Sequence, residues 1–166
     1  MKNDFRLKYP LWMMTFIVLL GVMAYALDSP AVEYVNTNSE TSLAVTIEPA
    51  KGTILIAAVA VYFILLGIFI LQLKKHNRQN PSQRISPFSI RPPEYLEQDE
   101  GMTYITRKAV QKVYTYITWA LPILAAVAII LPLPKIFIIY GILMVALGQY
   151  LIYYIEIRKH LKEETE

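Results

Sequence analysis

The sequence predicts an all-α membrane protein with four transmembrane helices, and two observations support this prediction. Of the 166 residues, 55% are hydrophobic and only 17% are charged, an excess of apolar residues that is typical of chains in contact with lipid. The charged residues and both histidines are also absent from four long runs. These runs place the spans at about residues 9–27, 53–73, 113–133 and 136–155, within a single membrane domain at 1–166.

The length of each run fits a membrane helix. About 20 residues of α-helix rise about 30 Å, which matches the thickness of the hydrocarbon core of a bilayer. A buried helix of a soluble protein usually keeps one polar face, and the strands of a membrane barrel alternate apolar and polar residues. The four runs have neither pattern, so helical spans are the interpretation that remains.

The distribution of basic residues predicts the orientation of the spans. All but Lys51 and Lys135 of the 16 Lys and Arg residues lie before the first run, between the second and third runs, or after the fourth. Cytoplasmic segments of membrane proteins are enriched in Lys and Arg. We therefore expect both termini in the cytoplasm, which agrees with the even number of spans.

The first run has a second interpretation. Ala24-Tyr25-Ala26 has the small-x-small pattern of a cleavage site, and basic residues precede the run, as in a signal peptide. The apolar part of a signal peptide usually has about 7–15 residues. The greater length of this run favours an uncleaved helix.

The segment at residues 28–52 is predicted to be external, as a short hairpin or a plain loop. Residues 31–35 and 42–47 are rich in β-branched and aromatic residues, and between them Asn36-Thr37-Asn38-Ser39 has the composition of a turn. An isolated two-stranded hairpin is only marginally stable in water. Both alternatives therefore stay open.

The polar region between the second and third runs is expected to be cytoplasmic and to have two parts. Prolines at positions 81, 87, 92 and 93 forbid a regular helix in a connector at 74–98. Residues 99–112 contain no proline, and Asp99 can cap a helix. Because Met102, Ile105 and Ala109 fall on one helical face, we predict an amphipathic helix at 99–112 that continues into the third span.

The sequence contains no group of residues that indicates catalysis, a cofactor or a metal ion. Cysteine is absent, which excludes thiolate nucleophiles and cysteine ligands. His76 and His160 lie outside the spans, where they cannot hold a haem between helices. Ionisable side chains within spans usually mark ion paths, but here only Glu156 comes close, and pairing at the surface explains it. We expect no enzyme activity.

Seven residues are candidates for contacts with a partner, because they are charged at the start of a helix or small or polar inside a span. They are Asp99, Glu100, Arg107, Lys108, Gly141, Gly148 and Gln149. Capping and the helix dipole also explain the acidic pair. The two glycines lie on one face and permit close helix contact, within the chain or between copies, and the glutamine can form an interhelical hydrogen bond.

A loose motif occupies the carboxy-terminal part of the chain. Asp99-Glu100 is followed by Ile105, by Lys108-Ala109 and aromatic residues, and then by two apolar spans and a basic tail. In this respect residues 94–162 resemble small membrane-protein families of unknown function from Gram-positive bacteria and archaea. The resemblance implies a two-span hairpin and a prokaryotic source, hence the bacterial plasma membrane, and it implies no catalytic residue.

Together these features favour a non-enzymatic accessory or regulatory protein that contacts a membrane-protein partner through its connector and its external segment. One alternative is a small oligomeric transporter or channel for a neutral or lipophilic solute, lined by Tyr62, Pro122, Tyr140 and Gln149. Another is a protein that confers immunity or resistance to a membrane-active peptide. The expected partners are the bilayer and a membrane protein or further copies of the chain. Nucleic acid is not expected, because the basic residues are dispersed among prolines and carboxylates.

Overall fold

The computed structural model describes residues 5–28, 31–37, 40–46, 48–79 and 100–163. The elements in chain order are α1 (Phe5–Leu27), β1 (Ala31–Thr37), β2 (Glu40–Thr46), α2 (Pro49–Gln79), α3 (Glu100–Ile130) and α4 (Lys135–Glu163). The expected cap Asp99 and the connector from residue 80 onward lie outside the described residues.

Each of the four helices contains a stretch that is long and apolar enough to cross a membrane. The stretches are Lys8–Leu27, Pro49–Gln79, Thr103–Ile130 and Lys135–Lys159. They overlap the four spans expected from the sequence. The prediction of a helical, multi-pass membrane protein is therefore confirmed.

Several helices extend beyond the spans expected from the sequence, such as α4, which continues to Glu163. Prolines explain two of the ends that differ. α3 ends at Ile130 rather than near residue 133, because a residue that precedes a proline disfavours the α conformation and Pro132 and Pro134 follow in close succession. α2 continues past the expected end of its span to Gln79, since the first proline after it is Pro81. The connector expected from residue 74 thus begins at least one turn later.

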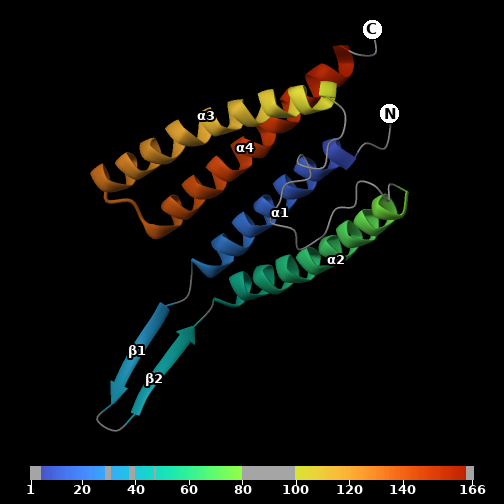
Figure 1. The fold of residues 1–166 in the computed structure, drawn as a ribbon. Coiled ribbons are helices and arrows are strands. Elements are labelled where there is room, and N and C mark those ends of the chain that lie inside the picture. The colour runs from blue at the N-terminus through green and yellow to red at the C-terminus, as the bar shows by residue number, and fades with distance from the viewer. Residues whose placement is uncertain (1–4, 29–30, 38–39, 47, 80–99, 164–166) are drawn as a thin grey trace.

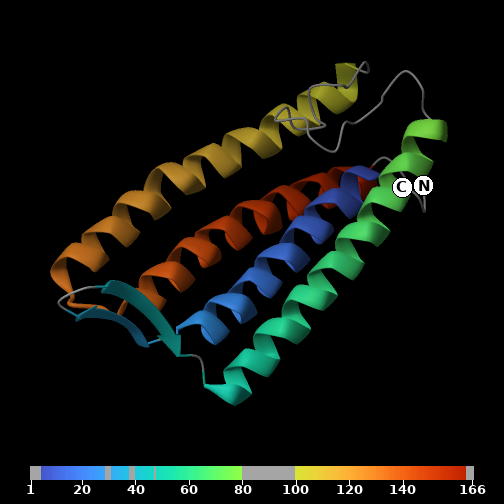
Figure 2. The same ribbon diagram turned by 90° about the horizontal axis from the view of Figure 1, so that it is seen from below.

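The four helices lie side by side in one open row. α3 packs against α4, α4 against α1, and α1 against α2, and the same order is visible in two perpendicular views (Figures 1 and 2). Helices α3 and α2 therefore form the two edges of the row. Both chain termini lie at one end of the helices, here called the terminal end, and the strands project from the other, the hairpin end (Figure 1).

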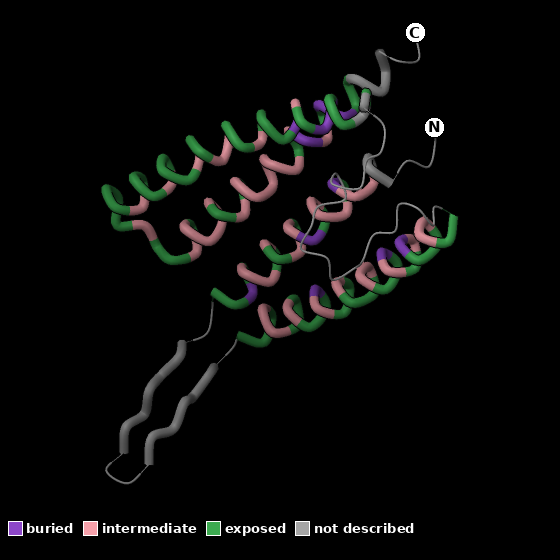
Figure 3. The backbone as a smooth tube through the Cα atoms, viewed as in Figure 1, coloured by how far each residue is buried: buried purple, intermediate pink, exposed green. Residues whose placement is uncertain are grey.

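Buried side chains are few and are confined to the contacts between neighbouring helices (Figure 3). Large apolar side chains on the outer faces stay exposed: Ile56 on α2 is 73% exposed and Ile129 on α3 is 85% exposed. So much exposed apolar surface would be unfavourable in water. It costs nothing against lipid tails, which are as apolar as these side chains.

The segment between α1 and α2 forms the hairpin rather than the plain loop. β1 and β2 pair antiparallel, with Val32 opposite Val45 and Tyr34 opposite Leu43. Since successive residues of a strand alternate between faces, this register puts all four of these apolar positions on one face of the ribbon. The ribbon is thus amphipathic by register.

The amphipathic helix expected before the third span is the first part of α3, which runs without a break from Glu100 to Ile130. Its apolar face packs on α4, where Ile105 and Ala109 form a buried cluster with Tyr153 and Ile157. The expected apolar face therefore serves contact with a neighbouring helix. The α3–α4 contact thus continues past the uncharged runs at 113–133 and 136–155, as far as Ile105 of α3 and Ile157 of α4.

Candidate functional site

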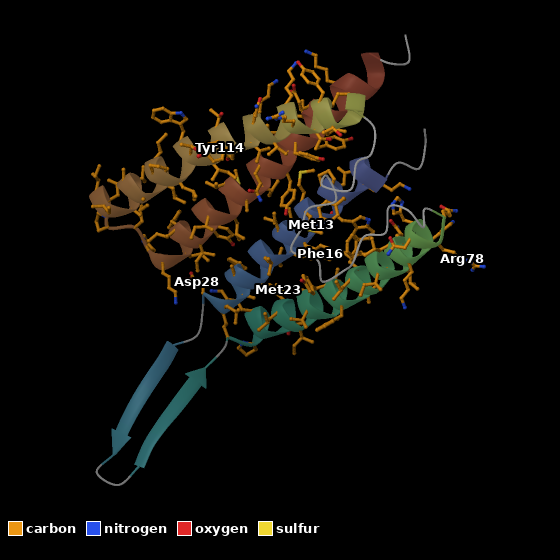
Figure 4. All side chains as sticks on the ribbon, viewed as in Figure 1. Met13, Phe16, Met23, Asp28, Arg78 and Tyr114 are labelled. Atoms are coloured by element: carbon orange, nitrogen blue, oxygen red, sulfur yellow. The ribbon has the colours of Figure 1, made fainter. Side chains whose placement is uncertain are left out.

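The contact between α1 and α2 is built from aromatic rings and one polar bond. Phe16 of α1 and Phe69 of α2 are buried, with ring centroids 5.9 Å apart in an edge-on arrangement, and Figure 4 labels Phe16 in this seam. Trp12 Nε1 donates a hydrogen bond of 3.1 Å to Gln72 Oε1. The indole N–H of Trp12 is therefore satisfied by the neighbouring helix instead of a lipid headgroup.

The contact between α1 and α4 also contains one polar bond. The Tyr140 hydroxyl of α4 donates a hydrogen bond of 3.2 Å to the Gly21 carbonyl of α1. An added Cβ at Gly21 would lie 3.6 Å from Tyr140 Cε1, an ordinary van der Waals distance, so the approach does not require a glycine. The phenol of Tyr140 is thus a fixed link between two spans.

The contact between α3 and α4 contains an ion pair near the terminal end. Lys112 Nζ donates to Glu156 Oε2 at 2.6 Å, and the Glu156 side chain is only 8% exposed whereas that of Lys112 is 52% exposed. A buried carboxylate needs such a partner, because an unpaired charge is costly away from water. The expectation of a surface position for Glu156 was wrong: α3 covers this side of α4.

A polar atom without a partner lies on the same stretch of α3. The side chain of Thr106 is buried, and its Oγ1 has no hydrogen-bond partner among the described residues. A helical threonine can return its hydroxyl to the carbonyl four residues earlier, as Thr115 and Thr118 do in this helix. Such a rotation would satisfy Thr106 without any ligand.

The two glycines of the expected interaction face lie against α3 of the same chain. A Cβ at Gly141 would collide with the Leu124 side chain, and a Cβ at Gly148 would collide with the Tyr116 ring. The sequence left open whether these glycines contact another helix of the same chain or another copy of the chain. In the structure they contact α3 of the same chain. Their small size sets the close approach of α3 and α4.

The remaining candidates do not gather with the glycines. Arg107 is exposed on α3, Lys108 is half-buried beside it, and Glu100 is the first residue of that helix. Gln149 is half-buried within α4, and within the described part of the chain its amide forms no hydrogen bond. The charged candidates thus lie toward the terminal end of α3, apart from the glycine contact.

Sequence reasoning missed two pairings that link the helices, Trp12 with Gln72 and Lys112 with Glu156. Each residue looks ordinary where it stands, since aromatic, amide and charged residues are common near the ends of spans. Their pairing joins positions 60 and 44 residues apart, and no local pattern encodes it.

Among the described residues, no three His, Asp or Glu side chains are placed so that they could hold a metal ion. Three polar pairs link neighbouring helices. The arrangement is one that holds spans together and presents large apolar outer faces. Comparisons of the chain with protein-family models, with curated proteins and with solved structures find no match.

Replacement of Gly148 by Leu is expected to destabilise the folded protein by about 1–3 kcal/mol, because the new side chain would overpack the contact with Tyr116. Thermal unfolding in detergent measures the change. Gly67→Leu is the matched control, since a Cβ at Gly67 meets no atom within 4 Å. Equal effects of the two substitutions would contradict the assignment of Gly148 to the α3–α4 contact.

Replacement of Lys112 by Met is expected to destabilise the protein, because it removes the ammonium group that lies 2.6 Å from the buried Glu156 carboxylate. The expected loss is about 1–3 kcal/mol, less than for a fully buried pair because water reaches half of the Lys112 side chain. The double variant Lys112→Met, Glu156→Leu is expected to recover most of the stability. Additive losses in a double-mutant cycle would show that the two side chains act independently.

Proposed function

We propose that the protein is a non-enzymatic accessory or regulatory protein that acts through contacts with another membrane protein. The observation that supports this best is the open row of helices. Two edge helices each bury one side against a single neighbour, and their other sides carry large exposed apolar and aromatic residues. A partner span can therefore pack on α2 or α3 without any rearrangement.

The exposed side chains of the edge helices suit such a contact. On α2, Ile56, Phe63 and Leu71 are 73%, 65% and 67% exposed, while Phe69 and Leu73 of the same helix are buried against α1. On α3, Tyr114 is 72% exposed, and Figure 4 labels it on that helix. Aromatic residues are enriched at protein interfaces because one rigid side chain covers a large area.

The hairpin offers a second contact outside the spans. It projects from the hairpin end of the helices (Figure 1), and four apolar positions of β1 and β2, Val32, Tyr34, Leu43 and Val45, share one face by register. A two-stranded ribbon is marginal by itself in water and has two unpaired strand edges. Packing or strand addition by a partner would stabilise it.

The transporter alternative is less well supported. Of the residues proposed to line its path, Tyr62 lies in the α1–α2 contact, with its ring centroid 5.3 Å from that of Phe16. Tyr140 lies in the α1–α4 contact and is bonded to Gly21. The two tyrosines therefore belong to different seams and do not line one path through the protein.

We further propose the bacterial plasma membrane as the location, with the terminal end in the cytoplasm and the hairpin end outside. The distribution of basic residues supports this orientation, because only Lys51 and Lys135 belong to the segments at the hairpin end.

Photo-crosslinking tests the accessory role. A photoreactive phenylalanine analogue in place of Phe63 or Tyr114 is expected to form an adduct with a different membrane protein in native membranes, identified by mass spectrometry. The same analogue in place of the buried Phe69 or Tyr153 is the matched control and is expected to give no such adduct. Adducts formed only between copies of this chain would contradict the proposal and support a homo-oligomer.

Cysteine labelling tests the orientation, since the chain has no cysteine of its own. Glu48→Cys at the hairpin end is expected to react with a membrane-impermeant maleimide in intact cells. Lys159→Cys at the terminal end is expected to react only after the membrane is permeabilised. The reverse pattern would refute the proposed topology.

A further inference from the structure

The α1–α4 seam contains an apolar groove that opens at the hairpin end. Its volume is about 620 Å³, and its walls include Leu20, Met23 and Leu27 of α1 with Ile136 and Ile139 of α4. Figure 4 labels Met23 and Asp28 on this part of the chain. The groove is large enough for a section of an acyl chain and is apolar along its length.

One carboxylate and one ammonium group also line this groove. They belong to Asp28, which directly follows α1, and to Lys135, which begins α4. Both side chains are exposed, and among the residues that the structure describes neither has an ion-pair partner. Two further charged residues at this end, Glu48 and Lys51, lie 3.9 Å apart as a pair.

Asp28 and Lys135 each carry a charge of the opposite sign to the one that the nearby helix end favours. The carboxyl end of a helix favours a cation and the amino end favours an anion. Here Asp28 follows the carboxyl end of α1, which has no basic residue in its last turn, and Lys135 starts α4, which has no acidic residue in its first turn. Because α1 and α4 are antiparallel neighbours, one cation-attracting and one anion-attracting site meet at the same groove.

The level of the groove fits the boundary between headgroups and acyl chains. The membrane stretch of α1 ends at Leu27 and that of α4 begins at Lys135, so the charged pair lies where the spans leave the hydrocarbon core. The apolar walls extend from there into the core, as far as Leu20 and Leu143. A ligand must therefore be amphiphilic and carry both charges at one end.

From these observations we propose that the groove binds a zwitterionic phospholipid with a primary ammonium headgroup, from the leaflet at the hairpin end. The ammonium group lies at Asp28 and the carboxyl end of α1, and the phosphate lies at Lys135 and the amino end of α4. The acyl chain occupies the apolar groove. This inference rests on the groove and its charges and is independent of the accessory role.

Native mass spectrometry of the purified protein in detergent tests the proposal. Phosphatidylethanolamine and phosphatidylglycerol with identical acyl chains are added in competition. Phosphatidylethanolamine is expected to be retained about tenfold more strongly. Lys135→Gln is expected to weaken retention of both lipids, because both carry the phosphate, and Asp28→Asn is expected to remove most of the preference for phosphatidylethanolamine. Glu48→Gln and Lys51→Gln, which change charges at the same end but outside the groove, are the matched controls and are expected to keep it.

Two further experiments separate the contribution of the acyl chain from that of the headgroup. Ala24→Trp, which fills the groove, is expected to reduce retention of both lipids, with unfolding temperature as the check on folding. Water-soluble phosphoethanolamine is expected to compete only weakly, because it lacks the acyl chain. Equal retention of the two lipids, an unchanged preference in the Asp28 variant, unchanged retention of both lipids in the Lys135 variant, or competition by phosphoethanolamine as strong as by the lipid would each overturn the proposal.

Discussion

Inside a bilayer, apolar side chains gain almost nothing by leaving lipid for each other, so the arrangement of spans depends on the few contacts that lipid cannot replace. Among the described residues, each of the three helix contacts has one polar link of this kind. Trp12 bonds to Gln72 between α1 and α2, Tyr140 to the Gly21 carbonyl between α1 and α4, and Lys112 pairs with Glu156 between α3 and α4. These links, with the close approach at Gly141 and Gly148, determine which helices are neighbours.

The open row follows from this distribution of links. Every helix is held on the sides that carry a polar partner or a glycine, and the outer faces of α2 and α3 carry large exposed apolar side chains that lipid or another span can cover. The same geometry connects both proposals. The edges suit a partner protein, and the α1–α4 seam, held by Tyr140 deeper in the membrane, stays open enough at the hairpin end to leave a groove between Asp28 and Lys135.

The number and position of the helices could be predicted from the sequence because charge is excluded from the hydrocarbon core. The positions of prolines explain why α3 ends at Ile130 and α2 at Gln79. The contact at Gly141 and Gly148 was also foreseeable, since small residues seven apart mark a close helix approach. The order of the helices in the row could not be predicted, because spans that are apolar on all sides have no preferred face for contact. For the same reason the burial of Glu156 became visible only with α3 in place.

Helices α2 and α3 are the two edges of a row and are not neighbours in a closed bundle. Spin labels at cysteines in place of Phe63 and Tyr114, near the middle of these helices, test this arrangement by pulsed dipolar spectroscopy in nanodiscs, since the chain has no other cysteine. Neighbouring helix axes lie about 8–10 Å apart, so an open row of four places these two axes roughly 20–30 Å apart. A distance in that range would support the row, and a distance of about 10 Å between the helices would contradict it.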